Sequence, residues 1–258
     1  MTSGETSGKI QMSRVALVTG ASSGIGKACA LALLKESWTV ILVGRRLEAL
    51  QETASESGSP LAEVMPADLT KEDEVKKLFD QVEKRFGRLD LLFNNAGISI
   101  PYTLPSDMSG ETWRSAVDIN LNAAFYCLSN AFDLMKRQSP QGGRIINNGS
   151  ISAHVPRPGS IAYTATKHAI TGLTKAANLD GRCFDIAVGQ IDIGNVATDM
   201  TQKMTKGVHQ ADGSLKTEAR MELSAVTQTF MAMVNLPLAA NILTTTVMAT
   251  QMPYVGRG

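Results

Sequence analysis

Seven short apolar segments, rich in β-branched residues, alternate with longer helix-patterned segments along most of the chain. The apolar segments read RVALVTG, TVILVGR, LAEVMPAD, LDLLFNNAG, GRIINNGS, DIAVGQIDIG and NILTTTVMAT. Strands that are apolar on both faces are typical of parallel sheets covered by helices on both sides. The alternation therefore predicts a single α/β domain over residues 14–258. We expect a doubly wound, mostly parallel, seven-stranded Rossmann-type sheet with helices on both faces.

The segments between the predicted strands are predicted to form helices and one long loop. The helical segments read GIGKACALALLKE, RRLEALQETASES, TKEDEVKKLFDQVEKRFG, GETWRSAVDINLNAAFYCLSNAFDLMKRQ and AYTATKHAITGLTKAANL. The loop, Thr201–Arg220, is polar and long for a compact domain. Loops of that length often cover active sites, although a plain surface insertion would look similar. We favour a substrate lid spanning about residues 195–225.

Composition excludes some classes of partner. The chain has 258 residues, of which 43% are hydrophobic, and 25 basic residues face 24 acidic ones, so the net charge is +1. That balance gives no electrostatic reason to expect nucleic acid or an anionic membrane as a partner. No apolar run reaches the roughly 18 residues of a membrane-spanning helix. We expect a cytoplasmic protein that acts on a small molecule, with residues 1–13 as a disordered extension.

Cysteine and histidine residues give no metal-ligand spacing. Cys29, Cys127 and Cys183 are scattered along the chain, as are the three histidines. Scattered cysteines in a long chain are typical of buried small apolar residues in a reducing compartment. We therefore expect no metal site and three buried thiols.

Polar residues gather where the predicted strands end. They are Thr19–Gly20, Arg45–Arg46, Asp68, Asn94–Gly97, Ser150 and Gly194. Parallel strands end at one edge of the sheet, which is where open α/β sheets bind ligands. The sequence therefore predicts a ligand site at this edge.

The first strand runs into a glycine turn that suits a pyrophosphate. The sequence VTGASSGIGKA places Gly20, Gly24 and Gly26 between a strand and a helix. Glycines there allow close backbone approach, and the helix amino end attracts the anion. The spacing differs from Gly-x-Gly-x-x-Gly, so the evidence lies in the strand–turn–helix context.

The end of the second strand favours NADP(H) over NAD(H). An acid is expected there to bind the adenosine ribose, but the chain has Gly44 followed by Arg45 and Arg46. Guanidinium groups suit a ribose 2′-phosphate. Two solvated arginines are the alternative interpretation, although positive charge at a helix amino end is mildly unfavourable. Of the two, Arg45 is the preferred candidate because it is nearer the strand end.

Five motifs in order resemble the short-chain dehydrogenase/reductase family. They are TGASSGIG at 19–26, NNAG at 94–97, Asn120 in VDINL, Ser150 in INNGS, and YTATK at 163–167. The resemblance covers Val15 to about Thr198, and the remainder more loosely. It implies an NADP-dependent oxidoreductase of the EC 1.1.1 type that transfers a hydride between nicotinamide and a carbonyl or secondary alcohol.

The resemblance also implies which residues act. Tyr163 would be the general acid and base, Lys167 would make it a stronger acid and hold the nicotinamide ribose, Ser150 would bind the substrate oxygen, and Asn120 would hold a water behind the lysine. The physics is consistent, because a free tyrosine is a weak acid and a nearby cation stabilises its phenolate. Cofactor contacts are expected at Gly20, Ser22, Ser23, Gly24, Ile25, Gly26, Arg45, Arg46, Asp68, Leu69, Asn95, Ala96, Gly97, Tyr163, Lys167, Ile193, Gly194, Val196 and Thr198.

Three positions depart from the family pattern. Ile193 stands where proline commonly precedes Gly194, Gly149 stands where serine is frequent before Ser150, and the tail VMATQMPYVGRG lacks a glycine-rich ending. We expect the first departure to alter cofactor contacts locally without abolishing binding, because Gly194 and Thr198 remain.

The substrate and the assembly are less constrained. Candidate pocket walls are Ser99–Leu104, Ile151–Gly159, Ile193, Met200 and Met204, with His154 and Arg157 available to a polar substituent. They favour a moderately apolar ketone or a 3-oxoacyl thioester. The alternatives are an NADP(H)-sensing regulatory protein without turnover and a methyltransferase-type nucleotide fold. The resemblance implies a homotetramer or homodimer built by the helices at about 110–138 and 162–179.

Overall fold

The computed structural model describes residues 14–198, 201 and 207–255, so the expected extension at residues 1–13 lies outside the described chain. The main sheet has the strand order β3-β2-β1-β4-β5-β6-β9, and all its strand pairs are parallel. The seven predicted strands and the doubly wound fold are confirmed. The strands are β1 Val15–Thr19, β2 Thr39–Gly44, β3 Ala62–Pro66, β4 Leu91–Asn94, β5 Gly143–Asn148, β6 Ile186–Ile193 and β9 Thr244–Val247, with a separate antiparallel hairpin of β7 Val208–His209 and β8 Leu215–Lys216.

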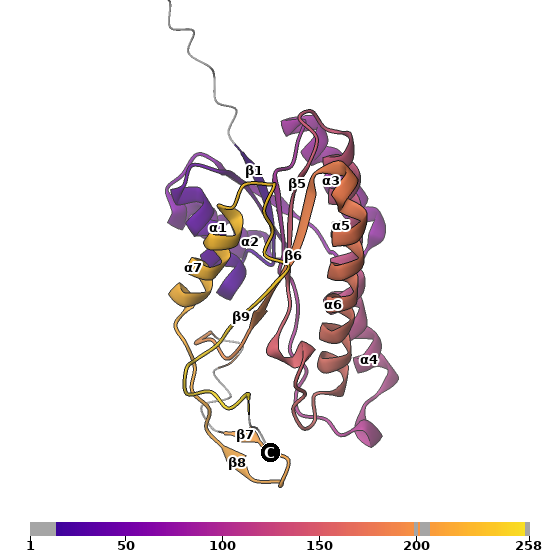
Figure 1. Cartoon of the computed structure of the whole chain (residues 1–258), viewed down its shortest axis with the longest axis vertical. Coiled ribbons are helices and arrows are strands. Elements are labelled where there is room, and N and C mark those ends of the chain that lie inside the picture. Colours follow the sequence, from indigo (N-terminus) through magenta and orange to yellow (C-terminus); the bar gives the residue numbers. More distant parts are fainter. Residues whose placement is uncertain (1–13, 199–200, 202–206, 256–258) are drawn as a thin grey trace, which may run out of the picture.

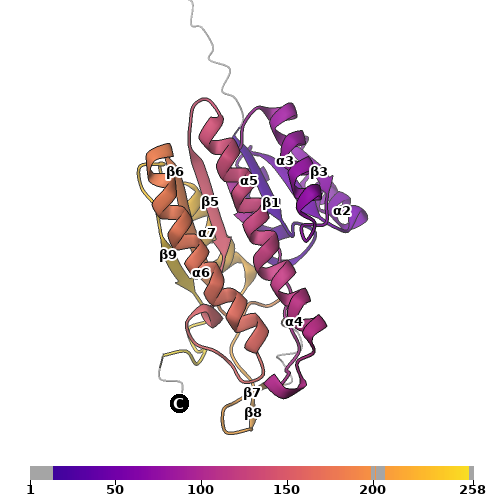
Figure 2. The same ribbon diagram turned by 90° about the vertical axis from the view of Figure 1, so that its right-hand side faces the viewer.

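Helices cover both faces of the sheet (Figure 1). In this view α1, α2 and α7 lie on one side, and α3, α5 and α6 lie on the other with α4 at the end of that layer. Figure 2 shows α4, α5 and α6 on the same face. The helices are α1 Gly24–Lys35, α2 Leu47–Ser57, α3 Glu72–Phe86, α4 Gly110–Val117, α5 Ala123–Arg137, α6 Ile161–Gly181 and α7 Leu223–Val234.

Each strand serves two hydrophobic cores, which explains why the strand sequences are apolar at every position. Ala16 and Val18 of β1 pack into the core under α1 and α7, whereas Val15 and Leu17 pack into the core under α3 and α5. Side chains alternate between the faces of a strand, so only a run without polar residues fills both cores. Burying a leucine such as Leu17, which is fully inaccessible, contributes about 1.5–3 kcal/mol.

Three features were not expected from the sequence. The predicted helix at about 110–138 is interrupted by a π turn at Asp118–Asn122. Helix α7 exists, and its Phe230 packs against Phe93 of β4 with ring centroids 4.5 Å apart. The hairpin β7–β8 lies within the predicted lid, beyond the lower end of the sheet in Figure 1.

The prediction of three buried cysteines is wrong at one position. Cys29 and Cys127 are buried, but Cys183 is exposed. Burial raises the pKa of the Cys127 thiol to about 12, because a thiolate is poorly solvated in an apolar core. Cys183 lies in the short turn Arg182–Phe184 after α6, outside either core.

The order in which strands are added to the sheet reverses between β1 and β4: β2 and β3 extend the sheet on one side of β1, and β4, β5 and β6 extend it on the other. Strand β1 pairs with β2 on one side and with β4 on the other. The loops that follow β1 and β4 therefore diverge to opposite faces and leave a crevice at their carboxyl ends. The predicted polar residues all follow strands at this edge.

Candidate active site

A cavity of about 660 Å³ opens at the carboxyl ends of the strands. It brings together almost all the residues predicted for the site. Those that line it are Gly20, Ser22, Ser23, Gly24, Ile25, Arg45, Arg46, Leu69, Asn95, Ala96, Gly97, Ser150, Tyr163, Lys167, Ile193, Gly194, Val196 and Thr198. Three predicted site residues do not line the cavity: Gly26, Asp68 and Asn120. Each of them instead contacts a segment that lines the cavity or adjoins its lining.

The glycine turn forms a cradle in which added side chains would collide. Gly20 and Gly24 have positive φ angles of +68° and +55°, which glycine adopts without strain. A Cβ on Gly26 would collide with the Gly20 carbonyl oxygen, so Gly26 closes the turn from behind. The N-cap residue of α1, Ser23, makes no side-chain capping hydrogen bond. The amino end of α1 therefore suits the pyrophosphate of a dinucleotide.

The two arginines occupy different places at the cavity rim. Arg46 donates from Nη2 to Ser22 Oγ at 3.0 Å and to Ser23 Oγ at 3.4 Å, and both arginines are solvent-exposed. Arg45 instead helps to lower the pKa of Asp68 through its positive charge. The guanidinium of Arg46 is thus held beside the glycine turn, whereas the sequence favoured Arg45. Cations at this rim fit a 2′-phosphate.

Asp68 faces its own loop, with its neighbours Ala67 and Leu69 lining the cavity. Its Oδ1 accepts hydrogen bonds from Thr70 N at 3.1 Å and Thr70 Oγ1 at 2.8 Å. Partial burial raises the pKa of Asp68, but those hydrogen bonds and the charges of Arg45 and Lys71 outweigh it, so the pKa is lower than usual. Asp68 is therefore ionised at neutral pH and can accept a hydrogen bond from an adenine amino group.

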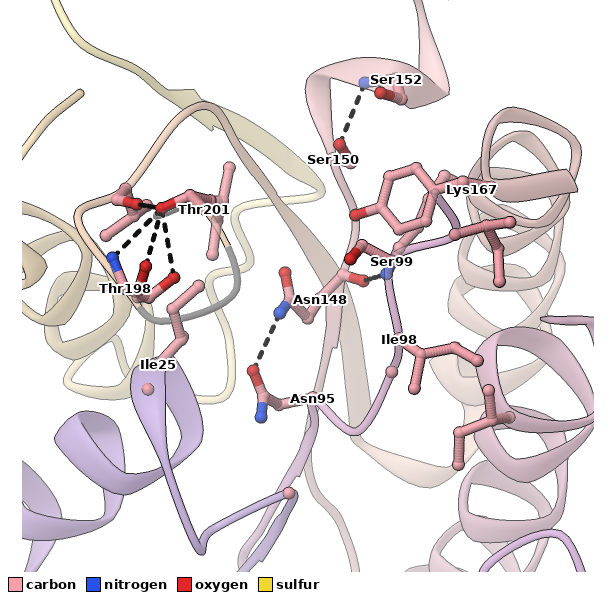
Figure 3. A pocket seen from close by; sticks show the side chains of 18 of the residues that line it. Ile25, Asn95, Ile98, Ser99, Asn148, Ser150, Ser152, Lys167, Thr198 and Thr201 are labelled. Atoms are coloured by element: carbon pink, nitrogen blue, oxygen red, sulfur yellow. Dashed lines mark hydrogen bonds between the residues drawn. The ribbon is translucent and has the colours of Figure 1, made fainter. Parts of the chain in front are cut away.

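The motif NNAG fastens neighbouring strand ends. Thr19 Oγ1 accepts hydrogen bonds from the amides of Asn95 and Ala96 at 2.8 and 2.9 Å. Asn95 Oδ1 accepts a hydrogen bond from Asn148 Nδ2 at 2.8 Å. Figure 3 shows this pair between Thr198 and Thr201 on one side and Ser150 and Lys167 on the other. Asn95 therefore ties the ends of neighbouring strands together, because its Nδ2 also donates to the carbonyl oxygen of Thr19 at 2.9 Å.

Tyr163 and Lys167 lie one turn apart near the amino end of α6. Lys167 Nζ is 5.6 Å from the centroid of the Tyr163 ring and donates to the carbonyl oxygen of Asn148 at 2.7 Å. The side chain of Lys167 is buried, and Tyr163 is half-buried. The ammonium therefore lies beside the tyrosine ring and is fixed there by the Asn148 carbonyl. The pair, together with Ser150, lies in the same cavity as the glycine turn.

Asn120 lies in the π turn between α4 and α5. Its Oδ1 accepts from the amide of Ile98 at 2.8 Å, and its Nδ2 donates to the carbonyl oxygen of Ile98 at 3.1 Å. Its side chain is thus bonded at both ends to the segment that follows NNAG. π turns inside α-helices often mark functional sites.

A family model described as short chain dehydrogenase matches residues 14–209. The chain belongs to the short-chain dehydrogenase family. A 3beta-hydroxysteroid dehydrogenase of Mediterraneibacter gnavus is 36% identical over 197 residues, covering 76% of this chain and 70% of the relative. A 3-oxoacyl-[acyl-carrier-protein] reductase of Staphylococcus aureus is 36% identical over 200 residues, covering 76% and 80%. These matches make the chain an oxidoreductase.

The fold of this short-chain dehydrogenase also matches a solved structure with a bound cofactor. The closed form of serine dehydrogenase complexed with NADP+ superposes with a TM-score of 0.83 at 26% identity. The match covers 94% of this chain and 97% of that chain. It supports a nicotinamide cofactor in the cavity.

A buried carboxylate missed in the sequence explains one departure from the family pattern. Asp192 Oδ1 accepts from the Ser150 amide at 2.9 Å, and its Oδ2 is 2.8 Å from His154 Nε2. A Cβ on Gly149 would collide with Asp192 and lie 2.7 Å from Gln190 Nε2. The short-chain dehydrogenase therefore has glycine where serine is frequent because Asp192 fills the space. His154 does not line the cavity; it faces Asp192.

The C-terminal segment explains the altered turn after β6. A Cβ on Gly194 would lie 2.7 Å from Met248 Cβ and 3.0 Å from Met252 Sδ. Met252 Sδ also accepts from the Asn195 amide at 3.4 Å. The tail thus packs under the turn and fixes Gly194, while Ile193 lines the cavity.

The segment predicted as a lid contributes part of the cavity lining. Thr201, Gly207, Val208 and His209 line it, and the His209 ring stacks on Tyr102 with centroids 4.0 Å apart. Ser99, Ile100 and Pro101 continue the wall as predicted. Thr103 and Leu104 do not line this cavity, and the predicted Met200 and Met204 lie outside the described residues. His209 was missed because nothing in its sequence context indicates a hairpin.

Residues 14–198, 201 and 207–255 are the part of the chain that the structure describes. In that part of the chain, no helix is long and apolar enough to cross a membrane. No cluster of histidine, cysteine, aspartate or glutamate there could hold a metal ion.

Proposed function

We propose that the chain is an NADP(H)-dependent oxidoreductase that transfers a hydride between the nicotinamide and a carbonyl or secondary alcohol. One observation carries the proposal: Tyr163, Lys167 and Ser150 line the same cavity as the glycine turn and Arg45–Arg46. The cradle for a pyrophosphate and the acid for a carbonyl oxygen are therefore in one site. The domain is a single unit over residues 14–258, with a lid at about 195–225.

Each catalytic residue has a distinct task. Tyr163 donates its phenolic proton to the carbonyl oxygen in reduction and accepts the proton back in oxidation. Lys167 stabilises the phenolate left behind. Ser150 donates a hydrogen bond to the same oxygen as negative charge develops on it. Asn120 fixes the segment at Ile98, and the family resemblance is the basis for proposing that it also holds a water behind Lys167. The cofactor supplies or accepts the hydride.

The proposed substrate is a moderately apolar ketone or a 3-oxoacyl thioester. Ile100, Ile151, Ile193, Val196 and Val208 give the cavity an apolar part of its lining. The relatives include a hydroxysteroid dehydrogenase and a 3-oxoacyl reductase. Their names motivate both substrate classes.

The competing function is an NADP(H)-sensing regulatory protein without turnover. A panel of ketones and alcohols, each incubated with NADPH, NADH, NADP+ and NAD+ and followed by absorbance, separates the two. Turnover with a ketone supports the oxidoreductase. Tight NADPH binding with no turnover across the panel would favour the sensor.

The cofactor preference is tested by binding of NADPH and NADH to wild type, Arg45→Ala and Arg46→Ala. Arg46 is held against Ser22 and Ser23, so we expect its loss to raise the Kd for NADPH by roughly tenfold to a hundredfold. The Kd for NADH should change little, because NADH has no 2′-phosphate. Arg45→Ala should raise the Kd for NADPH less than Arg46→Ala does. Tighter binding of NADH than NADPH by the wild type would contradict the preference.

A further inference from the structure

A buried ion pair borders the substrate end of the cavity. Arg157 donates from Nη2 to Glu218 Oε2 at 2.6 Å and to Asn195 Oδ1 at 2.9 Å. Asn195 Nδ2 donates to the same Glu218 oxygen at 2.9 Å. The side chain of Glu218 is 0% exposed and that of Arg157 is 13% exposed. Arg157 and Asn195 line the cavity, and Glu218 lies behind them.

This pair contributes to the charge that a substrate meets. Among the cavity-lining residues that the structure describes, Arg45 and Arg46 lie at the glycine turn, and Lys167 lies beside Tyr163. Arg157 is the remaining permanent cation of that described lining, and it contacts a buried carboxylate. No aspartate or glutamate belongs to the described lining. The lining residues that follow Arg157 in the chain, Pro158 and Gly159, carry no charge, and neither does Tyr102, which lies against Gly159.

An arginine that already pairs with a carboxylate binds a second anion less favourably than an unpaired arginine does. A substrate carboxylate entering this end would lose its hydration, which is costly unless a cation compensates it. Arg157 already contacts Glu218, and a second carboxylate at Arg157 would lie close to that buried anion. Like charges in a low-dielectric site repel strongly, so the Glu218 carboxylate offsets the attraction that Arg157 exerts on an incoming carboxylate. A neutral group, in contrast, avoids both costs.

We propose that the Arg157–Glu218 pair makes the site selective for uncharged carbonyl substrates and excludes keto acids. The proposal rests on the proposed function, because it concerns the substrate of that reaction. It narrows the substrate to ketones or keto esters whose far end is uncharged. Glu218 is then a specificity-determining residue that never touches the substrate, because it acts through Arg157.

The test compares substrates that differ only in charge. Levulinic acid and methyl levulinate have the same carbon skeleton and the same ketone, and a phenyl-bearing keto acid and its methyl ester form a second pair. We expect the wild type to use each ester with a kcat/KM at least roughly tenfold above that of the acid. Equal use of ester and acid, or preference for the acid, would overturn the proposal.

The variant Glu218→Gln tests the cause. It removes the buried anion and keeps a side chain of the same shape that can still form hydrogen bonds. The ratio of kcat/KM for the ester to kcat/KM for the acid should therefore fall by roughly tenfold or more. The ester-to-acid ratio is an internal measure, unaffected by a general loss of activity. Glu222→Gln, an exposed acid next to α7, should leave the ratio unchanged. An unchanged ratio in a folded Glu218→Gln protein would contradict the assignment.

The failure of this inference is distinguishable from failure of the proposed function. If no ketone in either pair is reduced with NADPH, the oxidoreductase assignment is overturned. Calorimetric binding of ester and acid to the NADP+-loaded protein then still tests charge selection. Binding of the ester alone supports the inference, whereas binding of the acid, or of neither, contradicts it. If Glu218→Gln does not fold, the wild-type ratios decide.

Discussion

At the scale of single residues, Gly149 departs from the family pattern because of a side chain that is distant in the sequence. The sequence marked Gly149 as unusual but gave no reason, because Asp192 is far along the chain. In the structure, Asp192 is fully buried and accepts the Ser150 amide. The same carboxylate therefore fills the space next to Gly149 and holds the backbone of Ser150.

Gly149→Ala should destabilise the protein by about 1–3 kcal/mol, because the added methyl group has no room beside Asp192. Gly172→Ala is the matched control. Gly172 lies inside α6, and an added Cβ there meets nothing within 4 Å. The control should be stabilising by roughly 0.5–1 kcal/mol. Urea unfolding of both variants measures the difference, and a Gly149→Ala protein as stable as the wild type would disprove the packing argument.

At the scale of elements, most helices and strands could be predicted, and the exceptions have a common cause. Strands that fill two cores are apolar throughout, so each was visible in the sequence. The hairpin β7–β8 was missed because it lies within the polar segment 201–220, where no periodicity indicates regular structure, and helix α7 was missed because it follows that segment directly. The π turn at Asp118–Asn122 was missed because its sequence, DINLN, continues a helical pattern.

The helices α4 and α5 also bear on assembly. Trp113 of α4 and Phe125 of α5 are 38% and 49% exposed. We propose that this face pairs two subunits, as expected for helices at about 110–138 in a homodimer or homotetramer. Phe125→Asp should lower the molar mass measured by light scattering while the circular dichroism stays unchanged. Leu238→Asp, at another exposed apolar position, is the control. A wild type that is monomeric at every concentration would contradict the pairing.

At the scale of the whole molecule, the sheet edge unites features that are far apart in the sequence. The glycine turn, NNAG, Ser150 and the Tyr163–Lys167 pair were each recognisable in the sequence, and the cavity brings them together. The buried partners were not recognisable. Asp192 and Glu218 carry no motif, because their roles depend on which loops the fold brings into contact.

The central claim is that Tyr163 is the proton donor of a carbonyl reductase. The most direct measurement is NADPH oxidation by wild type and Tyr163→Phe with the best ketone of the panel, with NADPH affinity measured in parallel. Loss of a general acid should lower kcat by roughly a hundredfold or more, while the Kd for NADPH remains nearly the same. A Tyr163→Phe enzyme that turns over at the wild-type rate would contradict the account.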